Sequence, residues 1–263
     1  MKLPITLASA LALSLAACSE APVAEVEAPT AQVVSDDVLA AAVANEARPD
    51  AARALDESRK PAEVLAFLGL EQGDHAADLI SGGGYWAEIL AEAVGENGSV
   101  TALEPEQFYN EERWTALSAT QPDIVLERYR FEDFQSEADR FDFAVMNLVY
   151  HDLYWESEEF DVPRSEPSAY LATLYAAMKP GGVVGVIDHV ANPGDTREAV
   201  EAYHRIDPAV VRADFERAGF VLEAESDMLA NPDDDRTTSV FEPEIRGKTD
   251  RFVMKFVKPE ASE

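Results

Sequence analysis

The chain has 263 residues, and 47% of them are hydrophobic, which is enough for the core of one α/β domain. Its 51 acidic and 21 basic residues give a formal net charge of −30. A chain this acidic is repelled by phosphate backbones, so we expect no nucleic-acid partner.

The N-terminus has the pattern of a bacterial secretory signal. Lys2 is a basic start, and residues 3–17 are almost wholly apolar and too short a run to span a bilayer. Residues 15–18 read Leu-Ala-Ala-Cys, which resembles a lipobox, and Cys18 is the only cysteine of the chain. We expect residues 1–17 to be a signal peptide and Cys18 to be lipidated. The alternative is an ordinary signal peptide followed by a chance cysteine.

By analogy with other lipoproteins, Ser19 indicates an outer-membrane protein that faces the periplasm, held to the membrane only through its lipid anchor. Residues 18–37 are rich in Ala, Pro, Val and Glu without a helical or strand period, which predicts a flexible tether. Residues 38–263 are then a single domain. It begins with one or two helices within 37–55 and 63–70, separated by the basic segment 59–61, and a first strand at 75–80.

Strands and helices alternate after the first strand. Such alternation predicts a Rossmann-like, doubly wound α/β fold with a mostly parallel, seven-stranded sheet. Because an irregular loop without a helix joins the last two strands, we expect them to close the sheet as an antiparallel hairpin. The expected helices are 87–94, 107–119, 168–178, 196–203 and 209–218, and the expected further strands are 99–103, 123–129, 141–148, 183–187, 220–226 and 251–257.

A glycine-rich loop joins the first strand to the next helix. Residues 78–86 read Asp-Leu-Ile-Ser-Gly-Gly-Gly-Tyr-Trp. Glycine there permits positive φ and close approach of a ligand, and the helix N-terminus adds N–H donors. Glu104 ends the following strand, about 20 residues on, where an acid accepts hydrogen bonds from ribose hydroxyls. An NAD site would use the same parts.

Residues 61–258 resemble a class I S-adenosylmethionine (SAM)-dependent methyltransferase, and most of all a group of predicted envelope methyltransferases. The hairpin ending and the Lys-Pro-Gly-Gly turn at 179–182 favour SAM over NAD. The segments that carry the closer resemblance are 83–85, 147–154, 204–207 and 250–252. The resemblance implies methyl transfer from SAM to a small-molecule substrate.

The resemblance also implies how SAM is held. Asp78, Gly82 and Gly84 match the positions that cradle its methionine part, and Ser81 lies in the same loop. Glu104 matches the acid that holds the ribose. Glu132 or Asp133, after the third strand, would meet the adenine amino group. The family pattern is acid-x-Gly-x-Gly-x-Gly, and Ile80 stands where the first glycine would be.

Polar residues also end the fourth and fifth strands, on the edge of the sheet where ligands bind in such folds. We expect Asn147, His151 and Asp188 to be the catalytic residues, in one cleft near the glycine loop. Asn147 would lie near the methyl-transfer centre, and His151 would act as a general base unless its role is structural. Aromatic side chains would line the pocket or belong to the core: Tyr85, Trp86, Tyr150, Tyr154 and Trp155.

Other functions are compatible with the same residues. His151, His189 and His204 could bind a divalent metal together with Asp188, but their spacing fits no compact motif, so we expect no metal. A protein that keeps the fold and binds a ligand without methyl transfer is a second alternative. A third is an enzyme of another type that acts through His151, Asp188 and His189.

Overall fold

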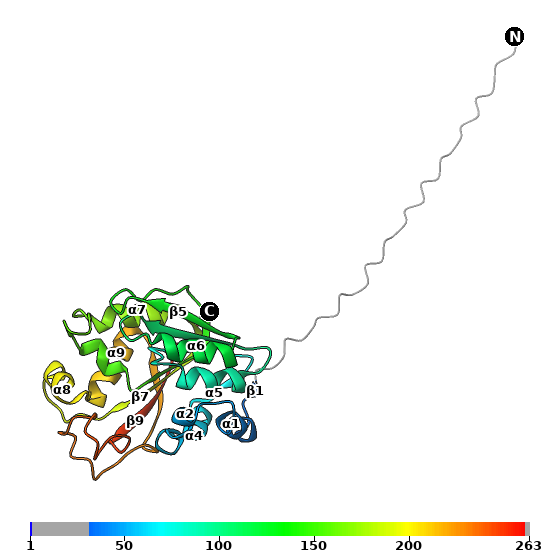
Figure 1. The fold of residues 1–263 in the computed structure, drawn as a ribbon. Coiled ribbons are helices and arrows are strands. Elements are labelled where there is room, and N and C mark those ends of the chain that lie inside the picture. Colours follow the sequence, from blue (N-terminus) through cyan, green and yellow to red (C-terminus); the bar gives the residue numbers. More distant parts are fainter. Residues whose placement is uncertain (2–31, 261–263) are drawn as a thin grey trace. The chain divides into compact units, whose positions relative to one another are not determined.

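The structure, a computed structural model, describes residue 1 and residues 32–260. Cys18 and the expected signal peptide, apart from residue 1, lie outside the described residues. Residues 32–260 are built around a seven-stranded sheet with the order β5-β4-β3-β6-β7-β9-β8 (Figure 1). Its strands are β3 (His75–Leu79), β4 (Ser99–Pro105), β5 (Ile124–Tyr129), β6 (Phe141–Asn147), β7 (Met178–His189), β8 (Val221–Ser226) and β9 (Arg251–Val257).

The direction of the strands confirms the predicted fold class. Strands β3 to β7 are parallel, whereas β9 is antiparallel to both β7 and β8. The sheet is therefore Rossmann-like and mostly parallel, and it ends in an antiparallel pair. The carboxyl ends of β3, β4, β6 and β7 meet at one edge of the sheet, and this edge positions the candidate site.

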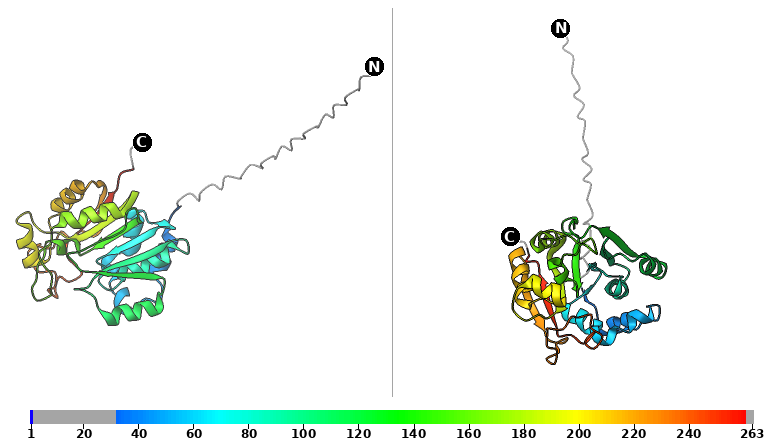
Figure 2. Two further views of the ribbon diagram at one scale, coloured as in Figure 1. Left: turned by 90° about the horizontal axis from the view of Figure 1, so that it is seen from above. Right: turned by 60° about the vertical axis from the view of Figure 1, so that its left-hand side comes forward.

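Helices cover both faces of the sheet (Figures 1 and 2). The buried residues of α1, α4, α5 and α6 form one hydrophobic core, and those of α7 and α9 form a second. None of the helices in this part of the chain has the length and apolar character needed to cross a membrane. The helices are α1 (Asp36–Val43), α2 (Asp50–Arg53), α3 (Asp56–Arg59), α4 (Pro61–Leu68), α5 (Tyr85–Val94), α6 (Glu111–Thr120), α7 (Pro167–Ala177), α8 (Thr196–Tyr203) and α9 (Pro208–Ala218), together with the 3-10 helix η1 (Tyr150–Tyr154).

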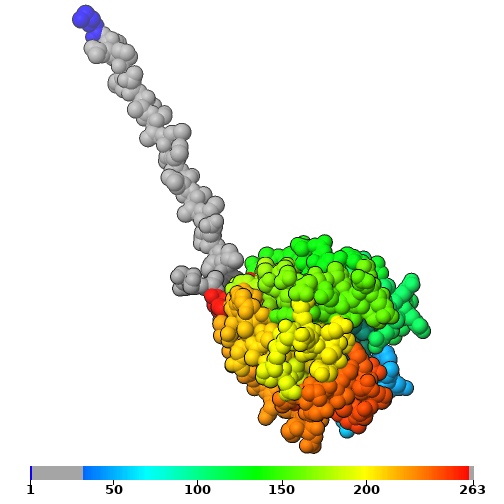
Figure 3. All heavy atoms as spheres, turned by 90° about the vertical axis from the view of Figure 1, so that its left-hand side faces the viewer, coloured from blue at the N-terminus to red at the C-terminus, as the bar shows by residue number. Residues whose placement is uncertain are grey.

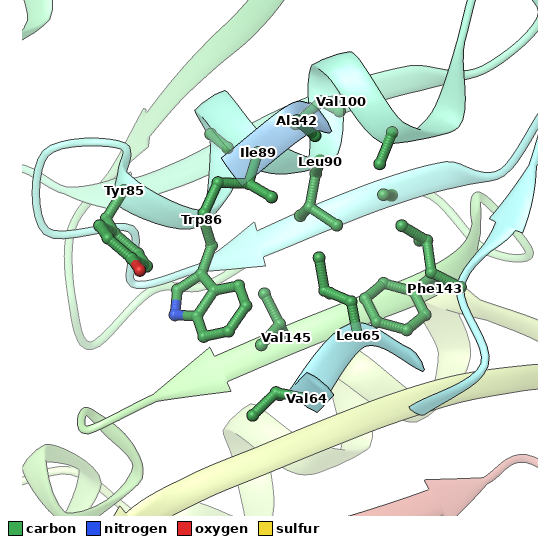
Figure 4. Packing of buried hydrophobic residues seen from close by; sticks show 14 of the residues in the cluster. Ala42, Val64, Leu65, Tyr85, Trp86, Ile89, Leu90, Val100, Phe143 and Val145 are labelled. Atoms are coloured by element: carbon green, nitrogen blue, oxygen red, sulfur yellow. The ribbon is translucent and has the colours of Figure 1, made fainter. Parts of the chain in front are cut away.

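Helix α5, which follows the glycine loop, is anchored by the first core. Trp86, Ile89 and Leu90 recur at helical spacing and are all buried. In Figure 4, Trp86 and Leu90 point toward Val145 of β6 and Leu65 of α4. Burying each of these side chains contributes about 1.5–3 kcal/mol. The start of α5, and the loop before it, are thus fixed against the sheet.

The expected tether extends too far toward the domain. Within its range of 18–37, β1 (Gln32–Val33) pairs with β2 (Glu71–Gln72), and Val34 is buried in the first core. The Ser35 hydroxyl then caps α1 by accepting a hydrogen bond from the Val38 N–H. These residues belong to the domain because Val34 buries its side chain there. The remainder of the tether range lies outside the described residues.

Candidate functional site

The glycine loop is tied to the elements on both sides of it by Asp78. One carboxylate oxygen of Asp78 accepts the backbone N–H of Ala87 at 3.1 Å and also the Ser81 hydroxyl. Burial raises the pKa of Asp78 to about 7, although both hydrogen bonds act to lower it. Asp78 and Ser81 therefore fix the shape of the loop, and the Asp78 carboxylate is already hydrogen-bonded within the protein.

The acid at the end of β4 has one oxygen to offer to a ligand. Oε2 of Glu104 accepts the backbone N–H of Gly82 at 2.7 Å. Its other oxygen, Oε1, is buried and makes no well-aligned hydrogen bond among residues 32–260, although the Trp114 indole lies close enough to lower the pKa of Glu104. Burial raises the pKa of Glu104 to about 7. Because buried polar atoms are nearly always paired in folded proteins, a ligand hydroxyl beside Oε1 would complete this site, as the ribose of SAM would.

The departure from the glycine pattern at Ile80 leaves the backbone shape intact. Ile80 has φ of 53°, in the left-handed region that glycine adopts freely, and its side chain is buried in the second core. A branched residue in this conformation is strained by about 1–3 kcal/mol. Gly82, Gly83 and Gly84 also have positive φ, of 59°, 103° and 85°. The loop thus keeps the course that the motif requires.

Helix α6 packs on the same loop and supplies a second reason for its glycines. A Cβ on Gly84 would lie 2.2 Å from Cδ2 of Leu117, and one on Gly83 would lie 2.9 Å from Cζ of Arg113. The guanidinium of Arg113 also donates to the Gly82 carbonyl at 3.1 Å. Part of the glycine requirement therefore comes from this packing. The carboxylate of Glu104 remains the feature that points to a ligand.

The two acids that the sequence predicts to meet the adenine lie on the surface of the protein. Glu132 is bound to Gln107 at 3.0 Å and to Arg130, and Asp133 is exposed. The backbone N–H of Phe131 donates to Gln107 as well. The carboxylates of Glu132 and Asp133 thus belong to a surface network, and the structure gives no separate sign of an adenine contact.

His151 and Asp188 are in contact at the ends of β6 and β7. Nδ1 of His151 lies 2.8 Å from Oδ1 of Asp188, and the backbone N–H of His151 donates to Oδ2 at 2.9 Å. Asp188 has no exposed surface. Both of its oxygens are bonded to His151, so its role is to orient that residue. Asn147, the third expected catalytic residue, ends β6 and is half-buried.

The charge of His151 differs from that of a general base. Burial lowers the pKa of His151, but the charges of Asp188 and Asp152 outweigh it and raise the pKa to about 9. Burial likewise raises the pKa of Asp188, yet the charge of His151 outweighs it and keeps that pKa below its ordinary value. His151 is then an imidazolium at neutral pH. The two acids beside His151 thus favour a hydrogen-bond donor at this position over the base that the sequence predicts.

A cavity of about 740 Å³ opens beside His151. Its wall combines the loop after β6, the ends of β7 and β9, the α2–α3 segment and the loop before β9. Asn147, Asp188 and the glycine loop are not among its lining residues, so the single cleft expected for all of them stays a prediction. The lining residues are Ala54, Leu55, Glu57, Ser58, Arg59, Leu148, His151, Asp152, His189, Val240, Phe241, Arg246, Gly247, Lys248, Thr249 and Arg251.

The long loop between β8 and β9 is held in place by α8. Figure 3 shows α8 (yellow) and this loop (orange to orange-red) side by side on one face. The fully buried Arg205 donates to both carboxylate oxygens of Asp234, at 2.8 and 3.1 Å. The N–H of Val240 donates to the Tyr203 carbonyl. One wall of the cavity is therefore fixed, although it lies in an irregular segment.

Two of the expected histidine ligands lie close to each other and to an acid that the metal alternative did not include. His151, Asp152 and His204 each offer a ligand atom, and these atoms lie within 4.8 Å of one another. Nδ1 of His204 is buried without a hydrogen-bond partner in the described part of the chain. Two imidazoles and a carboxylate suit a divalent ion such as Zn²⁺. His189 is bound instead to the Thr249 hydroxyl, at 2.7 Å.

The aromatic residues that could line a pocket belong mostly to the core. Tyr85 and Trp86 are buried in the first core, and Tyr150 is buried in the second. The hydroxyl groups of Tyr150 and Tyr154 both donate to Asp214 of α9. Trp155 packs edge-on against His204, with the ring centroids 5.4 Å apart. None of these five residues lines the cavity beside His151.

The cavity also contains residues that the sequence did not assign to a site. Arg59 and Arg251 are the clearest, because both line it together with His151 and His189. The signal in the sequence was the basic segment 59–61 in so acidic a chain, together with Arg251 in one of the segments that carry the family resemblance. What was lacking was any sign that segments almost 200 residues apart meet, which only the fold provides.

Comparisons with known proteins agree on the fold. No protein-family model matches the chain, and no curated protein sequence matches it. A SAM-dependent methyltransferase from Aquifex aeolicus superposes with a TM-score of 0.57 at 20% identity, over 80% of this chain and 98% of that one. One from Mesorhizobium loti gives 0.53 at 19% identity, over 77% and 99%.

Two further structures show how varied this fold is. The 1,6-didemethyltoxoflavin-N1-methyltransferase of Burkholderia thailandensis, solved with S-adenosylhomocysteine, gives a TM-score of 0.51 at 17% identity, over 80% of this chain and 79% of that one. The [4+2]-cyclase SpnF gives 0.54 at 14% identity, over 83% and 86%. The domain therefore has the fold of class I SAM-dependent methyltransferases, a fold that is also found in an enzyme named for another reaction.

Proposed function

We propose that the protein transfers a methyl group from SAM to a small-molecule substrate. The observation that carries the proposal is Glu104. Its buried Oε1 makes no well-aligned hydrogen bond among the described residues, although the Trp114 indole is near, and its Oε2 accepts the Gly82 N–H of the glycine loop. An acid at this strand end, beside a loop with three left-handed glycines, is suited to the ribose of a nucleoside cofactor. The shared fold favours SAM as that cofactor.

In this proposal, residues at two different strand ends bind the cofactor and the substrate. SAM would supply the methyl group. Glu104 would accept hydrogen bonds from the ribose hydroxyls, while Asp78 and Ser81 keep the loop in shape. His151, oriented by Asp188, would donate a hydrogen bond to the substrate in the cavity. The buried setting of these groups excludes water and strengthens each contact.

Titration calorimetry with SAM and with S-adenosylhomocysteine tests the proposal. We expect both to bind, and we expect Glu104→Ala to weaken binding by about 1.5–3 kcal/mol, as for the loss of hydrogen bonds to a charged group. Glu106→Ala is the matched control, because Glu106 follows the same strand and is exposed. Equal affinities in a folded Glu104→Ala variant would remove the ribose role, and no binding of either compound would overturn the proposal.

We also propose that the protein acts in the bacterial envelope, anchored to the outer membrane through lipid on Cys18. The support is the Leu-Ala-Ala-Cys sequence at residues 15–18, with no other cysteine in the chain. In this setting the substrate is a compound of the periplasm or of the membrane surface.

A further inference from the structure

The cations of the cavity stand apart from the other cations of the molecule. Apart from Lys2, every Lys and Arg of the chain lies within residues 32–260. Of these, only Arg59, Arg246, Lys248 and Arg251 make neither an ion pair nor a side-chain hydrogen bond with another described residue, and all four line the cavity beside His151. The other cations donate to carboxylates or to backbone carbonyls, as Arg48 does to Asp56 and Arg197 does to Tyr154 and Ser165.

Of these four cations, Arg251 has the strongest need for a counter-ion. Only 6% of its surface is exposed, and its Nε is buried without a hydrogen-bond partner in the described residues. The neighbouring Asp250 is not available, because it is paired with Arg236 at 2.7 Å. An arginine cannot shed its proton to escape burial, so a buried guanidinium without an anion is costly. In a chain with 51 acidic residues, the lack of a partner here needs an explanation.

Arg59 is held in position without using its N–H donors. Its guanidinium lies over the Tyr85 ring, 4.2 Å from the centroid. The Tyr85 hydroxyl donates to Asp56 at 2.7 Å, and Asp56 is paired with Arg48. Asp56, three residues before Arg59, is therefore occupied, and the five donors of Arg59 make no hydrogen bond to any other described residue. A planar guanidinium held by stacking is prepared to bind a carboxylate or phosphate in two-pronged fashion.

The other residues of the cavity wall indicate the chemical character of the rest of the ligand. Leu55, Leu148, Val240 and Phe241 provide apolar surface. Two acids also line the cavity: Glu57 is exposed, and Asp152 lies 3.4 Å from Nε2 of His151. A volume of about 740 Å³ is within the usual range for small-molecule sites and excludes a folded partner.

We propose that this cavity binds a small organic anion, whose carboxylate or phosphate lies between Arg59 and Arg251 and whose body packs on the apolar wall. That this anion is the substrate rests on the function proposed above, but the binding itself does not. The site would also let a very acidic protein bind an acidic compound, because four cations line the cavity.

Calorimetry on the full chain, in a buffer without other small acids, tests the proposal. The probes are benzoate and phenyl phosphate, with benzyl alcohol as the neutral analogue. We expect at least one of the anions to bind ten times or more as tightly as benzyl alcohol, and the preferred anion identifies the acid class. Arg59→Met and Arg251→Met should each weaken it tenfold or more, whereas Arg164→Met, at an exposed surface ion pair, should not.

Thermal unfolding separates a ligand-binding arginine from a structural one. If Arg251 serves to bind an anion, its buried charge has no counter-ion in the free protein. Arg251→Met then removes that charge, and the unfolding midpoint without ligand should stay the same or rise. A fall in the midpoint together with unchanged anion affinity would overturn the proposal. So would anions that bind no better than benzyl alcohol.

The two proposals can fail separately. Anion binding without SAM binding would end the methyltransferase proposal and leave the anion site standing. SAM binding without anion binding would end the proposal of an anion site and leave the methyltransferase proposal standing.

Discussion

The carboxyl groups of Glu104 and Asp78 shape the candidate site, but their burial makes the folded protein less stable when they ionise. Both carboxyls are buried, and burial raises the pKa of each to about 7, compared with about 4 in an unfolded chain. The folded state therefore holds these protons more tightly than the unfolded state. Their stabilising contribution is present below about pH 4 and is lost as the pH rises toward 7. The site is thus least stable near the pH at which Glu104 becomes a full anion.

Glu104→Gln tests this conflict, because glutamine has the shape of the protonated acid. We expect the variant to match the wild type in urea unfolding at pH 4 and to be more stable at pH 8, by on the order of 1 kcal/mol or more. Glu106→Gln, at the exposed neighbour, should show no such difference between the two pH values. Parallel pH profiles for Glu104→Gln and wild type would show that the acid is not strained by burial.

At the scale of elements, the regular helices and strands followed from the sequence. Helix α8 has the predicted bounds, and α9 begins within one residue of them, because Asp195 and Asp207 cap these helices and Gly219 ends α9. The 3-10 helix η1 was not predicted, since a single turn has no hydrophobic period to read. Strand β7 begins at Met178 rather than at residue 183, because Met178 pairs with Phe141 across an irregularity in the ladder.

The site was less predictable than the fold for a related reason. Parallel strands place their carboxyl ends together, so the contact between His151 and Asp188 could be expected. The cavity, by contrast, depends on an irregular loop whose position is fixed by Arg205 and Asp234. No periodicity marks such a loop. Arg59 and Arg251 therefore remained unassigned until the fold brought their segments together.

The segment η1 carries the next prediction. If His151 donates a hydrogen bond to the substrate, His151→Ala should lower the rate of methyl transfer about 100-fold and leave SAM affinity nearly intact. His75→Ala, at an exposed histidine, is the control. His204→Ala tests whether His151 instead binds a metal. In that case, metal analysis would find an ion in the wild type, and both His151→Ala and His204→Ala would lose the ion and the activity. A loss of folded protein without a change in turnover would make His151 structural.

At the scale of the whole molecule, the charge of −30 and the cationic cavity belong to one arrangement. Repulsion keeps an acidic surface away from anionic head groups and nucleic acids, while the cavity concentrates positive charge at a single point. An anchor of lipid on Cys18 would then hold at the membrane a domain that the membrane surface itself does not attract. Under this proposal, the location would depend on the modification and not on the surface of the domain.

Fractionation of cells that express the wild type and Cys18→Ser tests the anchor. Stable attachment needs more than one acyl chain, and the modified cysteine of a lipoprotein carries them, so the wild type should sediment with the outer membrane. Cys18→Ser should be found in the soluble periplasm or accumulate with residues 1–17 still attached. Ser19→Ala is the control, because it leaves the thiol in place. A wild-type protein that is soluble in the cytoplasm and retains residues 1–17 would contradict the envelope location, and the domain would then work in the compartment where SAM is made.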